Sequence, residues 1–174
     1  MKRFLALTLC FALGHQPLAF AQGGSFKQIR YNGGAVATQV KQDDWGNSLV
    51  IDSKQITLWI KGGQRIDIDP ARVSSLTYGQ EAHRRIGTMV ALGILVAPLA
   101  LLGLLHKTRL HYIGIQYANA DGNSGVLLQG HKDNYRAVLF ALQSVTKQPV
   151  SVSEEDRKYV PIGVQTSEVR QAAK

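Results

Sequence analysis

The chain has 174 residues, 20 of them basic and 12 acidic, with a formal net charge of +8, and this length suits one domain with a hydrophobic core. Its single cysteine, Cys10, excludes an internal disulfide. The modest positive charge fits an anionic neighbour such as lipid or an anionic polymer, but on charge alone we favour a simple solubility role.

The first 21 residues have the pattern of a secretory signal peptide. A basic pair precedes an apolar run, Phe4 to Leu13, and Ala19-Phe20-Ala21 supplies the small-x-small cleavage pattern. The run is too short to cross a bilayer as a helix. We therefore expect export from the cytoplasm, removal of residues 1–21, and a mature chain that begins at Gln22.

Residues 26–78 have the pattern of short strands separated by turns. Ile56, Leu58 and Ile60 alternate with Thr57 and Trp59 on the opposite face of a predicted strand. The paired glycines at positions 62 and 63 favour a hairpin turn. Proline cannot donate to a strand ladder, so a strand is expected to end before residue 70. The predicted strands are Ala35–Gln42, Ser48–Ile51, Gln55–Ile60, Arg65–Asp69 and Arg72–Tyr78.

An apolar segment, Ile86 to Leu105, interrupts this pattern with 20 residues that carry no charge. Its length matches that of a helix crossing a bilayer. The residues expected to contact the membrane are Ile86, Met89, Val90, Leu92, Leu95, Leu99, Leu101, Leu102 and Leu105. The basic flanks expected to lie at the membrane surface are Arg84, Arg85, Lys107 and Arg109, since cations there are attracted to anionic lipid.

Three interpretations of this segment remain open at this point. Pro98 fits the first turn of a second helix, so the segment can be a helical hairpin that dips into one leaflet. It can also be a true span that separates two units, or a segment buried in protein, for instance in a homo-oligomer. A single span conflicts with one barrel built from both halves, because strands must pair to satisfy their backbone groups.

The strand pattern resumes at Leu110 and ends in a helix. A strand over Leu110–Tyr117, a turn at Asp121-Gly122 and a returning strand over Ser124–Gln129 precede Asp133, which is expected to cap a helix. The apolar face of that helix is expected to comprise Tyr135, Val138, Leu139, Leu142 and Val145. Residues 153–174 are expected to form a flexible tail.

The predicted order of elements, seven strands followed by a closing helix, is that of the pleckstrin-homology-like fold. The stretches SLVIDSKQITLWIKGGQRIDIDPARVSSLTYG and HYIGIQYANADGNSGVLLQGHKDNYRAVLFALQSVTKQPV resemble uncharacterised exported bacterial proteins with a split barrel of this kind. The resemblance implies an α+β fold, a small antiparallel seven-stranded barrel with a C-terminal helix and an inserted apolar helical segment or hairpin. It places this domain at residues 22–152, and it implies a binding or scaffold role without naming a ligand.

Catalytic and metal-binding patterns are weak in this sequence. Asp67 and Asp69 share one face of a strand, which suits an acid/base pair or Ca²⁺ but equally the polar face of a half-buried strand. The histidines lack zinc-motif spacing, and neither a nucleophile elbow nor a phosphate-binding glycine motif is present. We expect no catalytic, cofactor or metal site, and no nucleic-acid partner, because no basic stripe carries interleaved aromatics.

These observations together predict an exported, membrane-associated, non-catalytic binding or scaffold domain of the cell envelope. The expected partners are membrane lipid and either an envelope protein or a second copy of the chain. A soluble periplasmic carrier of an apolar ligand, with the insertion as lid or cavity lining, is a second interpretation. A single-pass membrane protein with separate N- and C-terminal units is a third, and an enzyme that uses Asp67 and Asp69 is the least favoured.

Overall fold

A computed structural model describes residues 23–38, 40–79, 81–82, 85–86, 110–120 and 122–168. The predicted signal peptide lies outside these described residues, as does the apolar segment apart from Ile86. The strands are β1 (Gly24–Gly34), β2 (Asn47–Ile51), β3 (Ile56–Ile60), β4 (Gln64–Ile68), β5 (Val73–Tyr78), β6 (His111–Asn119), β7 (Gly122–Gly130), β8 (Val150–Val152) and β9 (Thr166–Glu168). The helices whose two ends both lie within the described residues are the 3₁₀ turn η1 (Pro70–Arg72), α3 (Tyr135–Thr146) and α4 (Glu154–Arg157).

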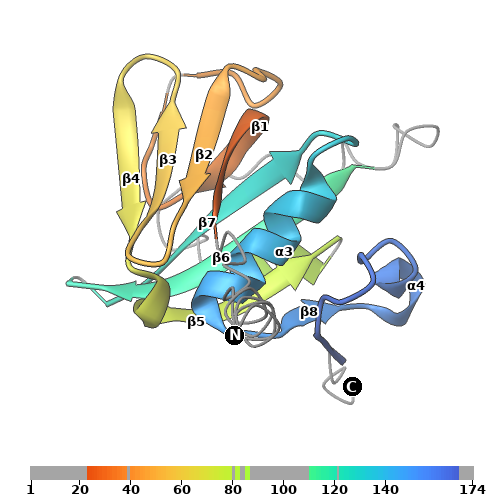
Figure 1. Ribbon diagram of the computed structural model, residues 1–174. Coiled ribbons are helices and arrows are strands. Elements are labelled where there is room, and N and C mark those ends of the chain that lie inside the picture. The colour runs from red at the N-terminus through yellow and green to blue at the C-terminus, as the bar shows by residue number, and fades with distance from the viewer. Residues whose placement is uncertain are drawn as a thin grey trace, which may run out of the picture.

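The nine strands form one mixed sheet in the order β4-β3-β2-β1-β7-β6-β5-β8-β9 (Figure 1). Strands β1 to β7 pair antiparallel, whereas β5 with β8 and β8 with β9 pair parallel. The prediction of a seven-stranded antiparallel barrel with an inserted apolar helix is therefore wrong. The physical reason is that the chain returns after α3 and adds β8 and β9 beside β5, so that β4 and β9 are the outer strands of the sheet.

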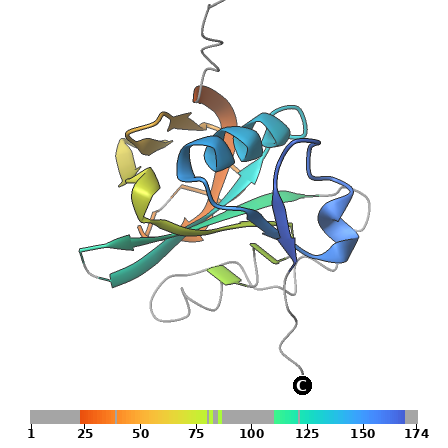
Figure 2. The ribbon, with the colours of Figure 1, turned by 60° about the horizontal axis from the view of Figure 1, so that its bottom comes forward.

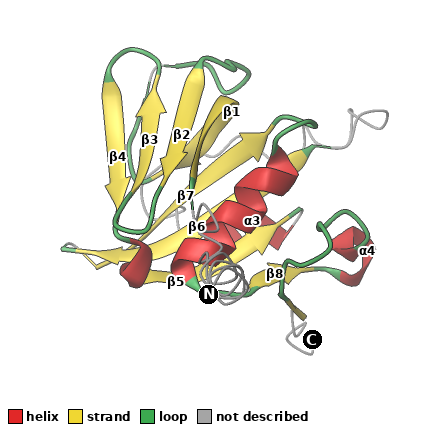
Figure 3. Cartoon of the chain, viewed as in Figure 1, coloured by secondary structure: helices red, strands yellow, loops and turns green. Residues whose placement is uncertain are grey.

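Strand β1 is shared by two parts of the sheet. Its first half pairs with β2 and its second half with β7, and the register shifts between Phe26 and Ile29 where Gln28 takes a positive φ of 57°. Such a bulge bends a strand and increases its twist. This bend lets one continuous strand join the β2–β4 hairpins to the β5–β7 strands (Figure 3).

The predicted strand at Ala35–Gln42 is wrong, because the described residues of this stretch form a loop. The hydroxyl of Tyr31 donates to the carbonyl of Val36 at 2.8 Å and accepts from its N–H at 3.1 Å. The N–H of Ala35 donates to the carbonyl of Gly125. These contacts occupy the backbone groups that a strand partner would need. Burial also raises the pKa of the Tyr31 hydroxyl to about 12.

The hairpin and strand predictions for residues 48–78 are confirmed to within one or two residues. Gly62 and Gly63 take φ values of 96° and 92° in the turn between β3 and β4, which glycine adopts without steric cost. Pro70 ends β4 as expected and opens η1, where the carboxylate of Asp69 accepts from the N–H of Ala71.

Helix α3 begins one residue later than predicted, with Asn134 rather than Asp133 at the N-cap. The amide of Asn134 donates instead to the carbonyl of Lys27 at 2.6 Å, and the carboxylate of Asp133 lies 3.1 Å from Nδ1 of His131. The predicted apolar face is confirmed at its centre, since Val138, Leu139 and Leu142 are all fully buried.

The end of the chain differs from the flexible tail that the sequence predicts from residue 153 onward. Ser153 caps α4 through its hydroxyl, which accepts from the N–H of Asp156, and β9 then pairs with β8. The side chain of Gln143 on α3 donates to the carbonyl of Gln165 and accepts from the N–H of the same residue. These contacts attach residues 154–168 to both the helix and the sheet.

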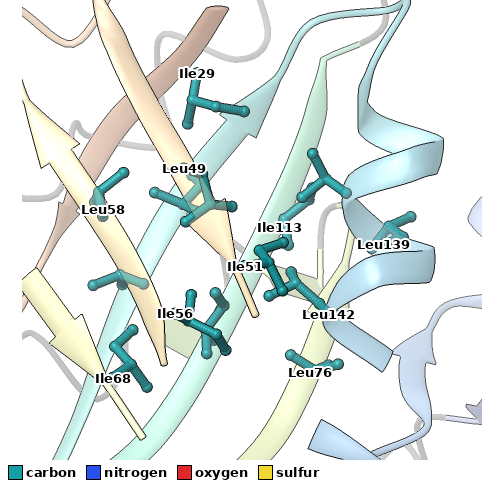
Figure 4. Packing of buried hydrophobic residues seen from close by; sticks show 14 of the residues in the cluster. Ile29, Leu49, Ile51, Ile56, Leu58, Ile68, Leu76, Ile113, Leu139 and Leu142 are labelled. Atoms are coloured by element: carbon teal, nitrogen blue, oxygen red, sulfur yellow. The ribbon is translucent and has the colours of Figure 1, made fainter. Parts of the chain in front are cut away.

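The hydrophobic core lies between α3 and the concave face of the sheet (Figure 4). Leu139 and Leu142 of α3 face aliphatic side chains from strands on both sides of β1, among them Leu49, Ile51 and Ile113. Burying side chains of this size is worth about 1.5–3 kcal/mol each. The inner face is therefore closed by large aliphatic groups.

Candidate functional site

Both ends of the apolar insertion leave the sheet at neighbouring positions. Strands β5 and β6 pair antiparallel, with Tyr78 opposite Ile113, and the N–H of Gly79 donates to the carbonyl of Tyr112 at 3.0 Å. Residues 80–110 therefore start and finish at one end of this strand pair. We call the described residues around this point, 78–79, 81–82, 85–86 and 110–114, the root of the insertion.

The root continues on the outer face of the sheet, opposite α3. Figure 2 shows the yellow-green pieces near residues 81–86 on the side of the sheet away from that helix. Ile86 and Ala82 are fully buried there and form a small cluster with Tyr112 and Leu127. The outer face thus has an apolar cluster of its own, separate from the main core.

Glycines on two neighbouring strands make room for this contact. A Cβ at Gly125 would lie 2.9 Å from Cδ1 of Ile86, whereas a Cβ at Gly114 would collide with the hydroxyl of Thr77 and would also lie 3.0 Å from Cγ1 of Ile86. Glycine inside a strand is typical of places where another part of the protein approaches closely. Gly114 and Gly125 therefore form a shallow seat on the sheet for the side chain of Ile86.

An ion pair accompanies this contact. The side chain of Glu81 is almost fully buried, and Nε of Arg85 lies 2.7 Å from its carboxylate one helical turn away. A buried carboxylate is costly without such a partner. Arg85, predicted as a membrane-surface cation, is therefore also an internal partner of Glu81, with about a third of its side chain exposed.

Stacked rings hold the root against the helix side of the molecule. Tyr78 Oη lies 2.8 Å from Nδ1 of His111, and the ring of His111 stacks on that of Tyr135 with centroids 3.7 Å apart. The hydroxyl of Tyr135 donates to the carbonyl of Tyr159 at 3.1 Å. These contacts connect β5, β6, α3 and the segment after α4 at the point where the insertion leaves the sheet.

Gly79 sits at the turn between β5 and the insertion. Its φ is +74°, a conformation that other residues adopt only with strain, and a Cβ here would collide with the carboxylate of Asp156. Asp156 itself is buried. This position of the root thus requires glycine both for its backbone and for its packing against α4.

The structure locates only two of the predicted membrane-contacting and flanking residues. Ile86 is buried against the sheet, and Arg85 is paired with Glu81. Within the described ranges, no helix is long and apolar enough to cross a membrane. The other predicted residues lie outside the described part of the chain: Met89, Val90, Leu92, Leu95, Leu99, Leu101, Leu102 and Leu105, together with Arg84, Lys107 and Arg109.

Sequence reasoning did not identify the glycine seat or the stacked rings. The signal for the seat was available, because Gly114 and Gly125 both interrupt strand patterns at positions that alternate with buried aliphatic residues. The ring stack joins residues from three separate elements, Tyr78, His111 and Tyr135. No local pattern in the sequence brings those three together.

The two carboxylates considered for catalysis serve separate structural contacts. Asp67 accepts from Nε of Arg65 at 2.7 Å and from the Thr57 hydroxyl at 3.0 Å, and the Arg65 hydrogen bond lowers the pKa of Asp67 below its usual value. Asp69 caps η1. Among the residues that the structure describes, no group of three or more histidine, cysteine or acidic side chains is placed to hold a metal ion.

No family model matches the chain, and no curated protein matches it either. Among solved structures, a chain from "Structure of the Spt16D Pob3N heterodimer" is similar over 76% of this chain and 56% of that chain, with 8% identity and a TM-score of 0.42. The match thus spans little more than half of that chain's length. A similarity at this level carries no argument about either the fold or the function of this chain.

Proposed function

We propose that this chain is an exported, non-catalytic domain that is held at a membrane of the cell envelope by its apolar insertion, with both ends of the insertion on the same side of the bilayer. The observation that carries the proposal is the pairing of β5 with β6 across the insertion, closed by the hydrogen bond from Gly79 to Tyr112. The domain would act as a binding or scaffold module at that surface.

The pairing of β5 with β6 favours an insertion that enters and leaves the membrane on one side over a single transmembrane span. One crossing would place β5 and β6 on opposite sides of the membrane, yet these strands share an antiparallel register from Tyr78–Ile113 to Val73–Tyr117. Separating them would leave two rows of backbone groups without partners. An insertion that enters one leaflet and returns to the same side satisfies both the apolar composition and the strand pairing.

The composition of the insertion favours lipid as its surroundings. It contains 20 consecutive residues without charge, and the chain has no acidic residue between Glu81 and Asp121. Basic residues at both ends of such a segment suit an anionic headgroup region. The proposed signal peptide, residues 1–21, would bring the chain to the non-cytoplasmic side of a membrane, where the apolar insertion could enter the bilayer.

Membrane fractionation of the expressed full chain tests the anchor. We expect the protein to pellet with membranes and to resist a salt wash, and the double variant Leu95→Asp/Leu101→Asp to be released, because a charge in the bilayer costs about 2.5–3.5 kcal/mol on insertion scales. A variant that pellets as fully as the wild type would show that the segment is not the anchor. A wild-type protein found wholly in the soluble fraction would favour the carrier of an apolar ligand instead.

Thiol labelling tests the same-side topology. The only cysteine of the chain is Cys10, within the predicted signal peptide, so single cysteines can be introduced at the exposed positions Ser53 and Asn123 on either side of the insertion. An impermeant maleimide added from outside should label both equally. Labelling of the Ser53→Cys protein alone would indicate a single span, and N-terminal sequencing of the same sample should begin at Gln22.

A further inference from the structure

Strand β4 forms one outer edge of the sheet. It pairs with β3 along its whole length, Gln64–Ile68, and among the described residues no strand lies on its other side (Figure 1). The opposite edge, β9, has only three residues. An outer strand presents unpaired N–H and C=O groups, which can bond to a strand from another chain. The β4 edge is therefore the longer of the two places where this sheet could be extended.

The backbone groups on this edge belong to Arg65 and Asp67. In the turn between β2 and β3, the N–H of Asp52 donates to the carbonyl of Gln55 at 3.0 Å. Because hydrogen-bonded and non-hydrogen-bonded pairs alternate along an antiparallel ladder, this bond fixes the alternation along β3 and directs the backbone groups of Ile66 toward that strand. The backbone groups of Arg65 and Asp67 therefore point away from β3, toward the open edge.

The exposed side chains of β4 carry one charge of each sign on the outer face of the sheet. Nε of Arg65 lies 2.7 Å from the carboxylate of Asp67, which also accepts from the hydroxyl of Thr57 at 3.0 Å. The guanidinium of Arg65 lies over the ring of Trp59, 5.2 Å from its centroid. These contacts hold both charged groups in place before a partner binds, which lowers the entropic cost of binding.

The order of these charges makes the edge complementary to itself. If two copies of β4 pair antiparallel around a two-fold axis at Ile66, Arg65 of each copy lies opposite Asp67 of the other. Opposite charges that face each other across two strands stabilise the pair, and like charges destabilise it. A shift of the register by two residues would place Arg65 opposite Arg65, or Asp67 opposite Asp67. The charges therefore favour the register centred on Ile66.

We propose that this chain forms a symmetric dimer with a second copy of itself through β4, in which Arg65 and Asp67 of both copies join in one network of charges. The two sheets would continue into one another across the two-fold axis. Charges on an edge commonly prevent pairing, but this pattern would select one register instead. The root of the insertion lies at β5 and β6, separated from β4 by β3, β2, β1 and β7, so the dimer leaves it unoccupied. The dimer does not depend on the membrane anchor.

Charge reversal tests this register. Arg65→Glu makes both charged positions of the edge acidic, and Asp67→Lys makes both basic. Each variant should dimerise about tenfold more weakly than the wild type, because like charges then face each other. An equimolar mixture of the two should form mixed dimers, since every acidic position then faces a basic one. Lys132→Glu, a charge reversal at an exposed position between β7 and α3, is the control and should dimerise as the wild type does.

A charge exchange within β4 separates the contact between copies from the ion pair inside one copy. Arg65→Asp/Asp67→Arg keeps one charge of each sign on the strand. It should dimerise with itself but not with the wild type, because each mixed pair would bring like charges together. Light scattering of the purified full chain in detergent micelles measures dimer formation, and co-purification of differently tagged chains detects mixed dimers. Thermal unfolding checks that each variant is folded.

Each other outcome overturns the dimer or its register. A wild-type chain that stays monomeric at every concentration overturns the dimer. Charge-reversed variants that dimerise as well as the wild type place any contact between copies away from β4. Variants that are weakened but not restored by mixing, or an exchange variant that mixes freely with the wild type, overturn the register centred on Ile66. Release of Leu95→Asp/Leu101→Asp from membranes tests the proposed function separately.

Discussion

The two faces of the sheet are closed in opposite ways. On the inner face, α3 places Leu139 and Leu142 against large aliphatic side chains from many strands. On the outer face, Ile86 rests on Gly114 and Gly125, where the absence of side chains lets the insertion approach the backbone. The inner face is packed like an ordinary hydrophobic core. The outer face is shaped at Gly114 and Gly125 to receive the single side chain of Ile86.

This difference indicates which face of the sheet tolerates exchange of its packed side chains and which face requires one particular residue. A core of large aliphatic residues tolerates exchange among them when volume is kept, because many neighbours can adjust slightly. The glycine seat depends on the residue that occupies it, since at Gly125 an added Cβ would meet Ile86 before any other group. Substitutions on the inner face should therefore change the stability of the whole domain, whereas those on the outer face should act mainly through the root.

The largest effect is expected on the inner face. Leu139→Ala should lower the free energy of unfolding by about 2–5 kcal/mol, because it removes a fully buried side chain and leaves a cavity. Phe140→Ala, the next residue on α3, is the matched control and should change it little, since half of that ring is exposed. Urea unfolding of both variants measures the difference. Equal losses at the two positions would contradict the packing of α3 on the sheet.

A smaller loss of stability is expected at Gly79, where β5 ends and the insertion begins. Gly79→Ala should destabilise the domain by about 2 kcal/mol or more, because a left-handed conformation costs a non-glycine residue about 1–2 kcal/mol and the new Cβ also displaces Asp156. Gly63→Ala is the control for strain alone, since Gly63 has a φ of +92° and open space around it. Thermal unfolding that ranks Gly63→Ala as equal or worse would argue against the Asp156 contact.

The outer face is tested by a double-mutant cycle. Gly125→Ala should cost about 1 kcal/mol, at the low end of overpacking, because the clash is with Cδ1 at the far end of Ile86. Adding Ile86→Ala removes that atom, so the two substitutions should be clearly non-additive, with Gly125→Ala nearly neutral in the Ile86→Ala background. Additive losses in denaturant unfolding would mean that Ile86 does not occupy the seat.

The smallest effect is expected away from both faces, on the exposed side of the β3–β4 hairpin. Because the hydrogen bond from Arg65 lowers the pKa of Asp67, its contribution to stability is present above about pH 4 and is lost as the pH falls through the lowered value. Asp67→Asn should lower the melting temperature by less than about 3 °C at pH 7. The two proteins should converge once the pH lies below the lowered pKa of Asp67, and a difference that persists there would indicate another cause.

The sequence was informative wherever structure depends on neighbouring residues. The hairpin at Gly62-Gly63, the end of β4 before Pro70 and the apolar face of α3 follow from local turn chemistry and periodicity, and all three are confirmed. The N-cap was misplaced by one residue because Asn134 bonds to Lys27, more than 100 positions earlier in the chain. A distant partner of this kind leaves no trace in local spacing.

The errors in overall fold arose from long-range pairing. The three residues of β8 and the three of β9 are too short to show alternation, yet their parallel pairing extends the sheet beyond β5. The loop after β1 resembled a strand, although the hydroxyl of Tyr31 occupies the backbone of Val36. At the candidate site, the apolar insertion was evident from composition, whereas its seat on Gly114 and Gly125 depends on which strands become neighbours.

The hydrogen bond between Gly79 and Tyr112 has a consequence for how this chain can evolve. This hydrogen bond brings the two ends of residues 80–110 together. The pairing of β5 with β6 therefore constrains where the insertion begins and ends, but not how many residues it contains. Doubling the length of a flexible connection costs only about 0.6 kcal/mol. Descendants of this gene could therefore lengthen, shorten or exchange the insertion while keeping the described sheet and α3 unchanged.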